Sequence, residues 1–181
     1  MSFYSDSAYP IRDDIDEIHA IQFGKLKLPG TWGTGEQRLA IISEARQAAF
    51  HAGILEEPNN PGIIPEIELS PVTRRVVGRL AVMPKDMDQE FYNQAIEEGL
   101  SDSQYVEIVG LVSRFMCFDI FARGIDIPLR PLPSPKSGPP SRKRPKEALI
   151  EKAWVPTIPN FPEGGEISKI LFGPWQPYIM R

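Results

Sequence analysis

The sequence contains very little cysteine and no long apolar run. Cys117 is the single cysteine among 181 residues, which excludes a disulfide within the chain and a zinc site built from several thiolates. No stretch approaches the roughly 20 consecutive apolar residues that a membrane-spanning helix needs. The start, MSFYSDSAYPIRDDIDE, is polar and acidic and lacks the apolar core of a secretory leader. These absences predict a cytoplasmic protein with no membrane partner.

Several motifs of nucleotide and metal enzymes are also missing. The chain has no Gly-rich phosphate loop, no nucleophile elbow and no kinase signature. Its two histidines lie far apart, at His19 and His51, so we predict neither a metal site nor a bound cofactor. The formal net charge of −4 excludes a globally basic nucleic-acid binder, although it leaves a local basic patch open. We therefore expect no nucleic-acid partner.

Proline is abundant and unevenly distributed. Of the 19 prolines, 12 lie at or after Pro128, which divides the chain into a body over residues 1–127 and an extended arm over residues 128–181. A short helix is expected at 146–154. The last fifteen or so residues are too apolar for a solvated linker. We therefore expect the arm to dock on the body or on a neighbouring subunit.

The body carries the signals of an all-α domain. Capping residues and apolar spacing predict helices at about 36–52, 71–82, 88–98 and 102–123, and the isoleucine spacing favours a further short helix near residues 11–21. Thr34, Ser70 and Ser101 are the expected N-caps. The helix at 102–123 is apolar on most faces, which is typical of a helix at the centre of a bundle or at a subunit interface.

Two segments resemble a known family. The stretches WGTGEQRLAIISEAR and EEGLSDSQYVEIVGLVSRFMCFDIFARGI look like the AhpD-like superfamily, which includes carboxymuconolactone decarboxylases and alkylhydroperoxidase-related proteins. The segment PLRPLPSPKSGPPSRKRPKEALIEKAWVPTIP is similar to the Pro-rich arm of the alkylhydroperoxidase-related branch. The resemblance covers roughly residues 32–160 and implies an AhpD-like helical bundle that forms homo-oligomers.

The ending PWQPYIMR resembles the opening of a further repeat of the same family. Larger members of the branch continue with a second repeat at this point. The chain is then either a natural half-length protein or part of a longer protein with two repeats. As a third possibility, this chain supplies one repeat, and a separate AhpD-like subunit supplies the second, cysteine-bearing repeat.

The chain departs from the family at the catalytic motif. Catalytic members carry C-x-x-C and a histidine near the end of the first family helix, where this sequence reads QAAFHAGI. Only His51 matches that relay, and Glu44 is the mid-helix candidate for its glutamate. The resemblance thus implies His51 and Glu44 as candidate catalytic residues, in a protein that lacks the thiols of a peroxidase.

The other chemistry-bearing residues have simpler interpretations. Cys117 is expected to be a small buried side chain, since free cysteine is among the most buried residue types. Glu107 and Asp119 sit on the apolar helix and require partners; Arg114, Arg123 or a residue of another subunit are the candidates.

Two charged segments remain. In the acidic N-terminal segment, we expect Asp16 to pair with His19. The basic run over residues 136–146 has no interleaved aromatic residue, so we expect a solvated linker rather than a phosphate-binding surface.

Three functions follow. The first is a catalytically degenerate AhpD-like protein that acts as an oligomeric scaffold. The second is an enzyme, either a thiol-independent carboxymuconolactone-decarboxylase-like catalyst or a peroxidase-related antioxidant protein. The third is a partner subunit of a second AhpD-like chain.

Overall fold

The computed structural model describes residues 2–144, 146 and 154–155, and the regular elements among them are helical. The chain divides into two units, over residues 1–143 and 144–181, and the helices lie in the first. Its elements are α1 (Asp13–Lys25), α2 (Gly35–His51), α3 (Pro71–Val82), the 3-10 turn η1 (Pro84–Asp86), α4 (Gln89–Glu97) and α5 (Asp102–Gly124). The all-α prediction is confirmed. The predicted helix at 146–154 and the apolar tail fall almost wholly outside the described residues.

Local capping explains where the helices begin. The Thr34 hydroxyl accepts a hydrogen bond from the backbone N–H of Gln37. The Gln37 side-chain oxygen in turn accepts one from the backbone N–H of Thr34. Ser101 and Gln104 form the same capping box at α5. Each box satisfies two backbone N–H groups that a helix start leaves unpaired. Ser70 caps α3 as predicted, and Pro71 occupies its first position, where a missing N–H costs nothing.

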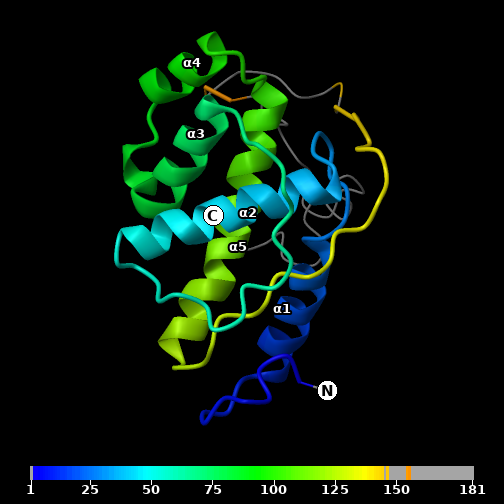
Figure 1. Ribbon diagram of the computed structural model, residues 1–181, viewed down its shortest axis with the longest axis vertical. Coiled ribbons are helices and arrows are strands. Elements are labelled where there is room, and N and C mark those ends of the chain that lie inside the picture. The colour runs from blue at the N-terminus through cyan, green and yellow to red at the C-terminus, as the bar shows by residue number, and fades with distance from the viewer. Residues whose placement is uncertain (1, 145, 147–153, 156–181) are drawn as a thin grey trace. The chain divides into compact units, whose positions relative to one another are not determined.

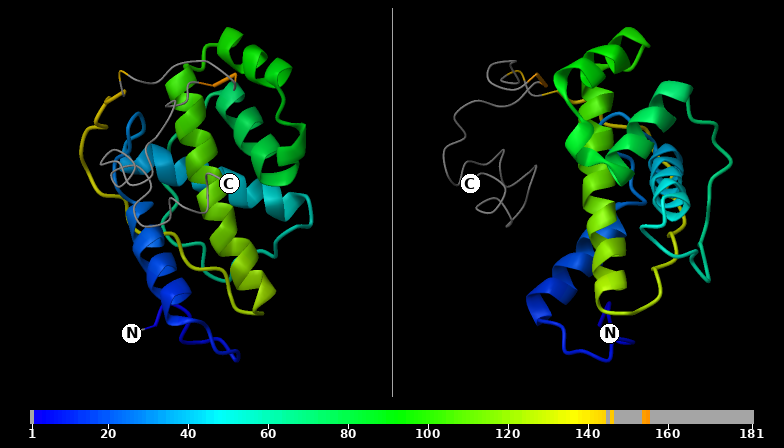
Figure 2. Two further views of the ribbon diagram at one scale, coloured as in Figure 1. Left: turned by 180° about the vertical axis from the view of Figure 1, so that it is seen from behind. Right: turned by 90° about the vertical axis from the view of Figure 1, so that its left-hand side faces the viewer.

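Helices α2, α3 and α5 pack against one another and form the main core. Helix α2 crosses the long α5, and α1 runs beside the C-terminal half of α5 (Figures 1 and 2). Fully buried aliphatic and aromatic side chains fill the centre: Leu39, Ile42, Val76, Val77, Val112 and Phe115. Each such side chain contributes roughly 1.5–3 kcal/mol on burial. Among the described residues, no helix is both long and apolar enough to span a bilayer.

The beginning of the arm runs along the body. Gly62 and Leu132 form an isolated parallel bridge, and Ile63 donates to the carbonyl of Leu132 over 3.1 Å. Gly62 has a φ of 76°, and a Cβ there would lie 2.9 Å from the carbonyl carbon of Leu132. Farther along, the backbone N–H of Lys136 donates to the carbonyl of Lys27 over 2.8 Å. Residues 128–143 therefore belong to the same compact unit as the helices.

Candidate functional site

The two candidate catalytic residues lie on α2 and do not meet. Glu44 is half-buried and His51 is exposed at the C-terminal end of the helix. They are seven residues apart, which corresponds to about 10 Å along a helix axis. The His51 ring lies 5.6 Å from that of Phe50, centroid to centroid. A proton relay needs hydrogen-bond distances of about 3 Å, and the described residues provide no such link between Glu44 and His51.

Cys117 is exposed, so its predicted place in the core is wrong. The reason is the phase of the helix. Neighbouring Phe115 and Phe118 are buried, but Cys117 falls on the side of α5 that turns away from α2 and α3. An apolar sequence neighbourhood does not bury a helical residue when the helix packs on one side only.

The most buried charges form an ion pair between α2 and α5. Arg46 donates to both carboxylate oxygens of Asp119, each over 2.8 Å, and the two residues are 4% and 1% exposed. Arg46 also donates to the carbonyl of Arg130 over 3.0 Å and lies over the Phe115 ring, 5.0 Å from its centroid. Burial raises the pKa of Asp119, while the hydrogen bonds from Arg46 oppose that rise. The predicted partners of Asp119, namely Arg114, Arg123 or another subunit, are therefore wrong.

A second ion pair fixes the loop before α2. Glu107 of α5 accepts from the Arg38 guanidinium over 2.8 Å and from the backbone N–H groups of Trp32 and Gly33, over 2.5 and 3.3 Å. The same alternatives, Arg114 or Arg123, are wrong here as well. Glu107 thus holds residues 30–33 in place, and both of its carboxylate oxygens are engaged in structural hydrogen bonds.

His19 takes Tyr4 as its hydrogen-bond partner, while the predicted partner Asp16 acts on it through its charge, which opposes the effect of burial on the pKa of His19. Its Nδ1 lies 2.6 Å from the Tyr4 hydroxyl, and its ring contacts Phe118 and Phe121 with centroids 5.1 Å away. Burial lowers the pKa of His19. Asp16 instead accepts from the N-terminal residues, including the backbone N–H of Tyr4 over 2.9 Å. His19 therefore links the N-terminal segment, through Tyr4, to α5, through Phe118 and Phe121.

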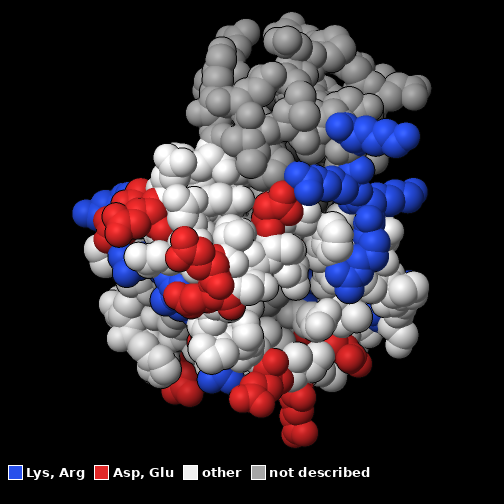
Figure 3. Space-filling model, turned by 90° about the horizontal axis from the view of Figure 1, so that it is seen from above, with Lys and Arg blue, Asp and Glu red and all other residues white. Residues whose placement is uncertain are grey.

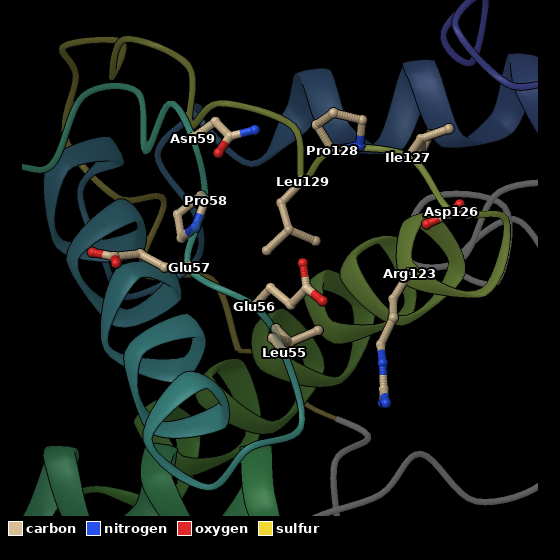
Figure 4. A pocket seen from close by; sticks show the side chains of 10 residues that line it. All are labelled: Leu55, Glu56, Glu57, Pro58, Asn59, Arg123, Asp126, Ile127, Pro128 and Leu129. Atoms are coloured by element: carbon tan, nitrogen blue, oxygen red, sulfur yellow. The ribbon is translucent and has the colours of Figure 1, made fainter.

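A small pocket lies between the loop after α2 and the turn after α5 (Figure 4). Its volume is about 110 Å³, which suits a few water molecules. Ten residues line it: Leu55, Glu56, Glu57, Pro58, Asn59, Arg123, Asp126, Ile127, Pro128 and Leu129. Neither Glu44 nor His51 is among them. Within the described part of the chain, no group of three or more histidine, cysteine or carboxylate residues is placed to hold a metal ion.

The outer face of α5 is the most distinctive surface of the helical unit. We define it by six exposed residues: Val106, Gly110, Ser113, Cys117, Ile120 and Gly124. Their spacing alternates between four and three residues, which is the pattern of a coiled-coil seam. Val106 and Ile120 are 41% and 43% exposed. Figure 2, left, views the molecule from the side opposite to α2, where α5 lies in front of α2. The sequence predicted a helix at the centre of a bundle or at a subunit interface, but it did not reveal which face is exposed.

The comparisons with known proteins add no assignment: no family model, no curated protein and no solved structure matches this chain. The candidate site therefore rests on the geometry of the described residues alone.

Proposed function

We propose that this chain is a non-catalytic, AhpD-like subunit that acts as a scaffold, and that two copies associate through the outer face of α5. The observation that carries the proposal is the seam itself. Two large aliphatic side chains and four small residues lie in one exposed stripe on a helix that is otherwise rich in buried residues. Exposed apolar surface arranged in this way is typical of protein–protein contacts.

The stripe is complementary to itself when two copies of α5 run antiparallel. With the two-fold axis between Ser113 and Cys117, Val106 faces Gly124 of the second copy. Ile120 faces Gly110, and Ser113 faces Cys117. Each large side chain then meets a glycine, so the helices approach closely and interdigitate. A two-fold contact uses the same patch on both copies, which is why we favour a second copy over an unrelated partner.

The placement of the charged residues supports a role without catalysis. The deeply buried Asp119 is saturated by Arg46, and Glu107 is held by Arg38 and the loop before α2. Glu44 and His51 are too far apart for a relay. The resemblance to AhpD-like proteins without their C-x-x-C is consistent with a scaffold that has lost the thiol chemistry.

The first test is the mass in solution of the full chain and of Ile120→Asp. We expect a concentration-dependent dimer by light scattering or sedimentation, and a monomer for Ile120→Asp, because a buried charge opposite Gly110 is costly. Ile63→Asp is the matched control, since Ile63 is 51% exposed and lies on the loop between α2 and α3, outside the seam. A monomer at all concentrations for the unmodified chain, or equal behaviour of the two variants, would refute the proposal.

Cross-linking tests the register. A chain carrying Ser113→Cys and Cys117→Ser is mixed with the unmodified chain and oxidised gently. The antiparallel seam places the thiol introduced at position 113 of one copy opposite Cys117 of the other, within the Cα separation of about 4.4–6.8 Å that a disulfide requires. We expect cross-linked heterodimers to exceed both homodimers. Dominant homodimers would indicate a different register or a parallel arrangement.

A further inference from the structure

The basic segment near residue 140 is held against the body. The backbone N–H of Ser141 donates to the carbonyl of Gly30 over 3.0 Å, and that of Arg142 donates to Thr31 over 2.8 Å. Gly35 makes the approach possible, since a Cβ there would lie 2.5 Å from the carbonyl oxygen of Lys27 and 2.6 Å from that of Lys136. Residues 136–142 are exposed apart from the half-buried Pro140, as expected of a solvated segment, but backbone hydrogen bonds attach them to the residues before α2.

This attachment brings an aromatic ring to the basic segment. The Arg142 guanidinium lies over the indole of Trp32, 5.0 Å from the ring centroid. Arg142 has a φ of 55°, a left-handed conformation that costs free energy for a residue other than glycine. Such a strained backbone conformation persists only where surrounding contacts hold the residue in place, and strained residues concentrate at functional sites.

The cations gather on one side of the unit. Backbone hydrogen bonds place Lys136 beside Lys27 and Arg142 beside Thr31, and the exposed Lys143 follows Arg142 directly in the chain. Figure 3 shows a cluster of lysine and arginine side chains at the right of the view, and a further group at the left, among acidic side chains. We name this surface the Trp32 patch and define it as Trp32, Lys27, Lys136, Arg142 and Lys143. It carries local positive charge in a chain whose net charge is −4.

We propose that the Trp32 patch binds single-stranded nucleic acid. Lysine and arginine would contact phosphates, and a base would stack in the Trp32–Arg142 layer. Proteins that bind single strands without sequence preference combine a positive track with an aromatic platform in this way. An acidic peptide would need the cations but would not use an indole stacked with a guanidinium, so the aromatic residue favours a nucleic acid. The inference replaces the expectation of no such partner, which rested on the net charge of −4 and on the lack of an aromatic residue within the basic run.

The test is fluorescence anisotropy of the full chain with a labelled single-stranded RNA of about 12 nucleotides. The patch variant is Lys136→Glu with Lys143→Glu. The control is Arg74→Glu with Lys85→Glu, which changes the charge equally at two exposed positions on α3 and η1. We expect binding to weaken at least about tenfold in the patch variant and its salt dependence to become about one unit shallower per phosphate-contacting lysine lost. The control should differ from the unmodified chain by about twofold or less.

A second readout reports stacking. Trp32 is one of three tryptophans, so Trp154→Phe with Trp175→Phe leaves it as the single indole. We expect its fluorescence to be quenched by the RNA, and the quenching to be lost in Arg142→Ala. Polyglutamate of similar length is the competing probe.

Three results would overturn the inference: absence of RNA binding, equal weakening in both charge variants, or equal binding of polyglutamate without quenching. The last would identify the patch as a surface for an acidic protein. Ile120→Asp should bind RNA as the unmodified chain does, so failure here is distinguishable from failure of the α5 interface.

Discussion

Arg46 of α2 and Asp119 of α5 form a two-pronged ion pair in the core, with both N–O distances at 2.8 Å. The pair links helices that are 73 residues apart in sequence. Arg46 Nη1 is buried and finds no hydrogen-bond partner among the described residues, so the guanidinium depends on Asp119, the Arg130 carbonyl and the Phe115 ring. Loss of the carboxylate would therefore leave a positive charge with too little compensation.

We accordingly expect Asp119→Asn to lower the free energy of unfolding by about 3–5 kcal/mol, the usual cost of breaking a buried pair on one side. Arg46→Met combined with Asp119→Leu should recover most of that loss, because both charges leave together. Asp86→Asn is the control, since the Arg79–Asp86 pair is 3.6 Å long and its side chains are 43% and 34% exposed, and we expect less than about 1 kcal/mol there. Urea denaturation measures the free energy of unfolding of all three variants. Equal losses for Asp119→Asn and Asp86→Asn would contradict a special role for the buried Arg46–Asp119 pair.

The acid sensitivity of the fold should depend on His19. Burial lowers the pKa of His19, so the unfolded chain binds the proton more tightly than the folded chain does. Stability is then complete above the unfolded pKa of about 6.5 and decreases as the pH falls through that value toward the folded pKa. The imidazolium also loses Nδ1 as an acceptor for the Tyr4 hydroxyl, 2.6 Å away.

The measurement is the urea midpoint at about pH 7 and about pH 5, the range in which histidine is the main titrating group. We expect His19→Gln to have lower stability at neutral pH and a flatter pH dependence. His51→Gln is the matched control, because it removes the other histidine from an exposed position. If the urea midpoint of His19→Gln fell between pH 7 and pH 5 as much as that of the unmodified chain, the acid sensitivity would belong to other groups.

Gly30 should tolerate no side chain. A Cβ at Gly30 would overlap the Glu107 carboxylate, with its carbon 2.9 Å away, and the Arg38 guanidinium. We expect Gly30→Ala to cost about 1–3 kcal/mol, the usual range for overpacking. Gly24→Ala is the matched control, because nothing lies within 4 Å of its Cβ and alanine favours a helix by up to about 1 kcal/mol. Thermal unfolding of both variants should give shifts of opposite sign.

The sequence predicted what depends on near neighbours. The boxes at Thr34 and Ser101 and the Ser70–Pro71 start are local, and the structure has them where they were expected. The partners of Glu107 and Asp119 were missed because Arg38 and Arg46 lie 69 and 73 residues away, a distance at which spacing carries no information.

The exposure of Cys117 was missed for a related reason. Helix α5 is apolar around most of its circumference, so periodicity alone gives no phase, and only the positions of α2 and α3 decide which side is covered. Trp32 was overlooked as a partner of the basic segment because the two meet through backbone hydrogen bonds between residues 30–31 and 141–142. Backbone pairing of irregular segments leaves no pattern in the side chains.

The absence of a second thiol near Cys117 predicts that the chain does not turn over hydroperoxides with a dithiol reductant. In a thiol peroxidase cycle, a thiolate attacks the peroxide O–O bond, which yields an alcohol and a sulfenic acid. A second thiol then condenses with the sulfenic acid to form a disulfide and release water.

Cys117 is the single cysteine and is exposed, so the second step has no partner in the chain. We expect a thiol reagent to modify Cys117 in the native monomer at low protein concentration and more slowly in the dimer, where Cys117 faces Ser113 of the second copy. Peroxide consumption should equal that of Cys117→Ser and of His51→Ala. Turnover that is lost only in Cys117→Ser would show that the exposed thiol is a nucleophile served by the added dithiol, and the scaffold assignment would then give way to an enzymatic one.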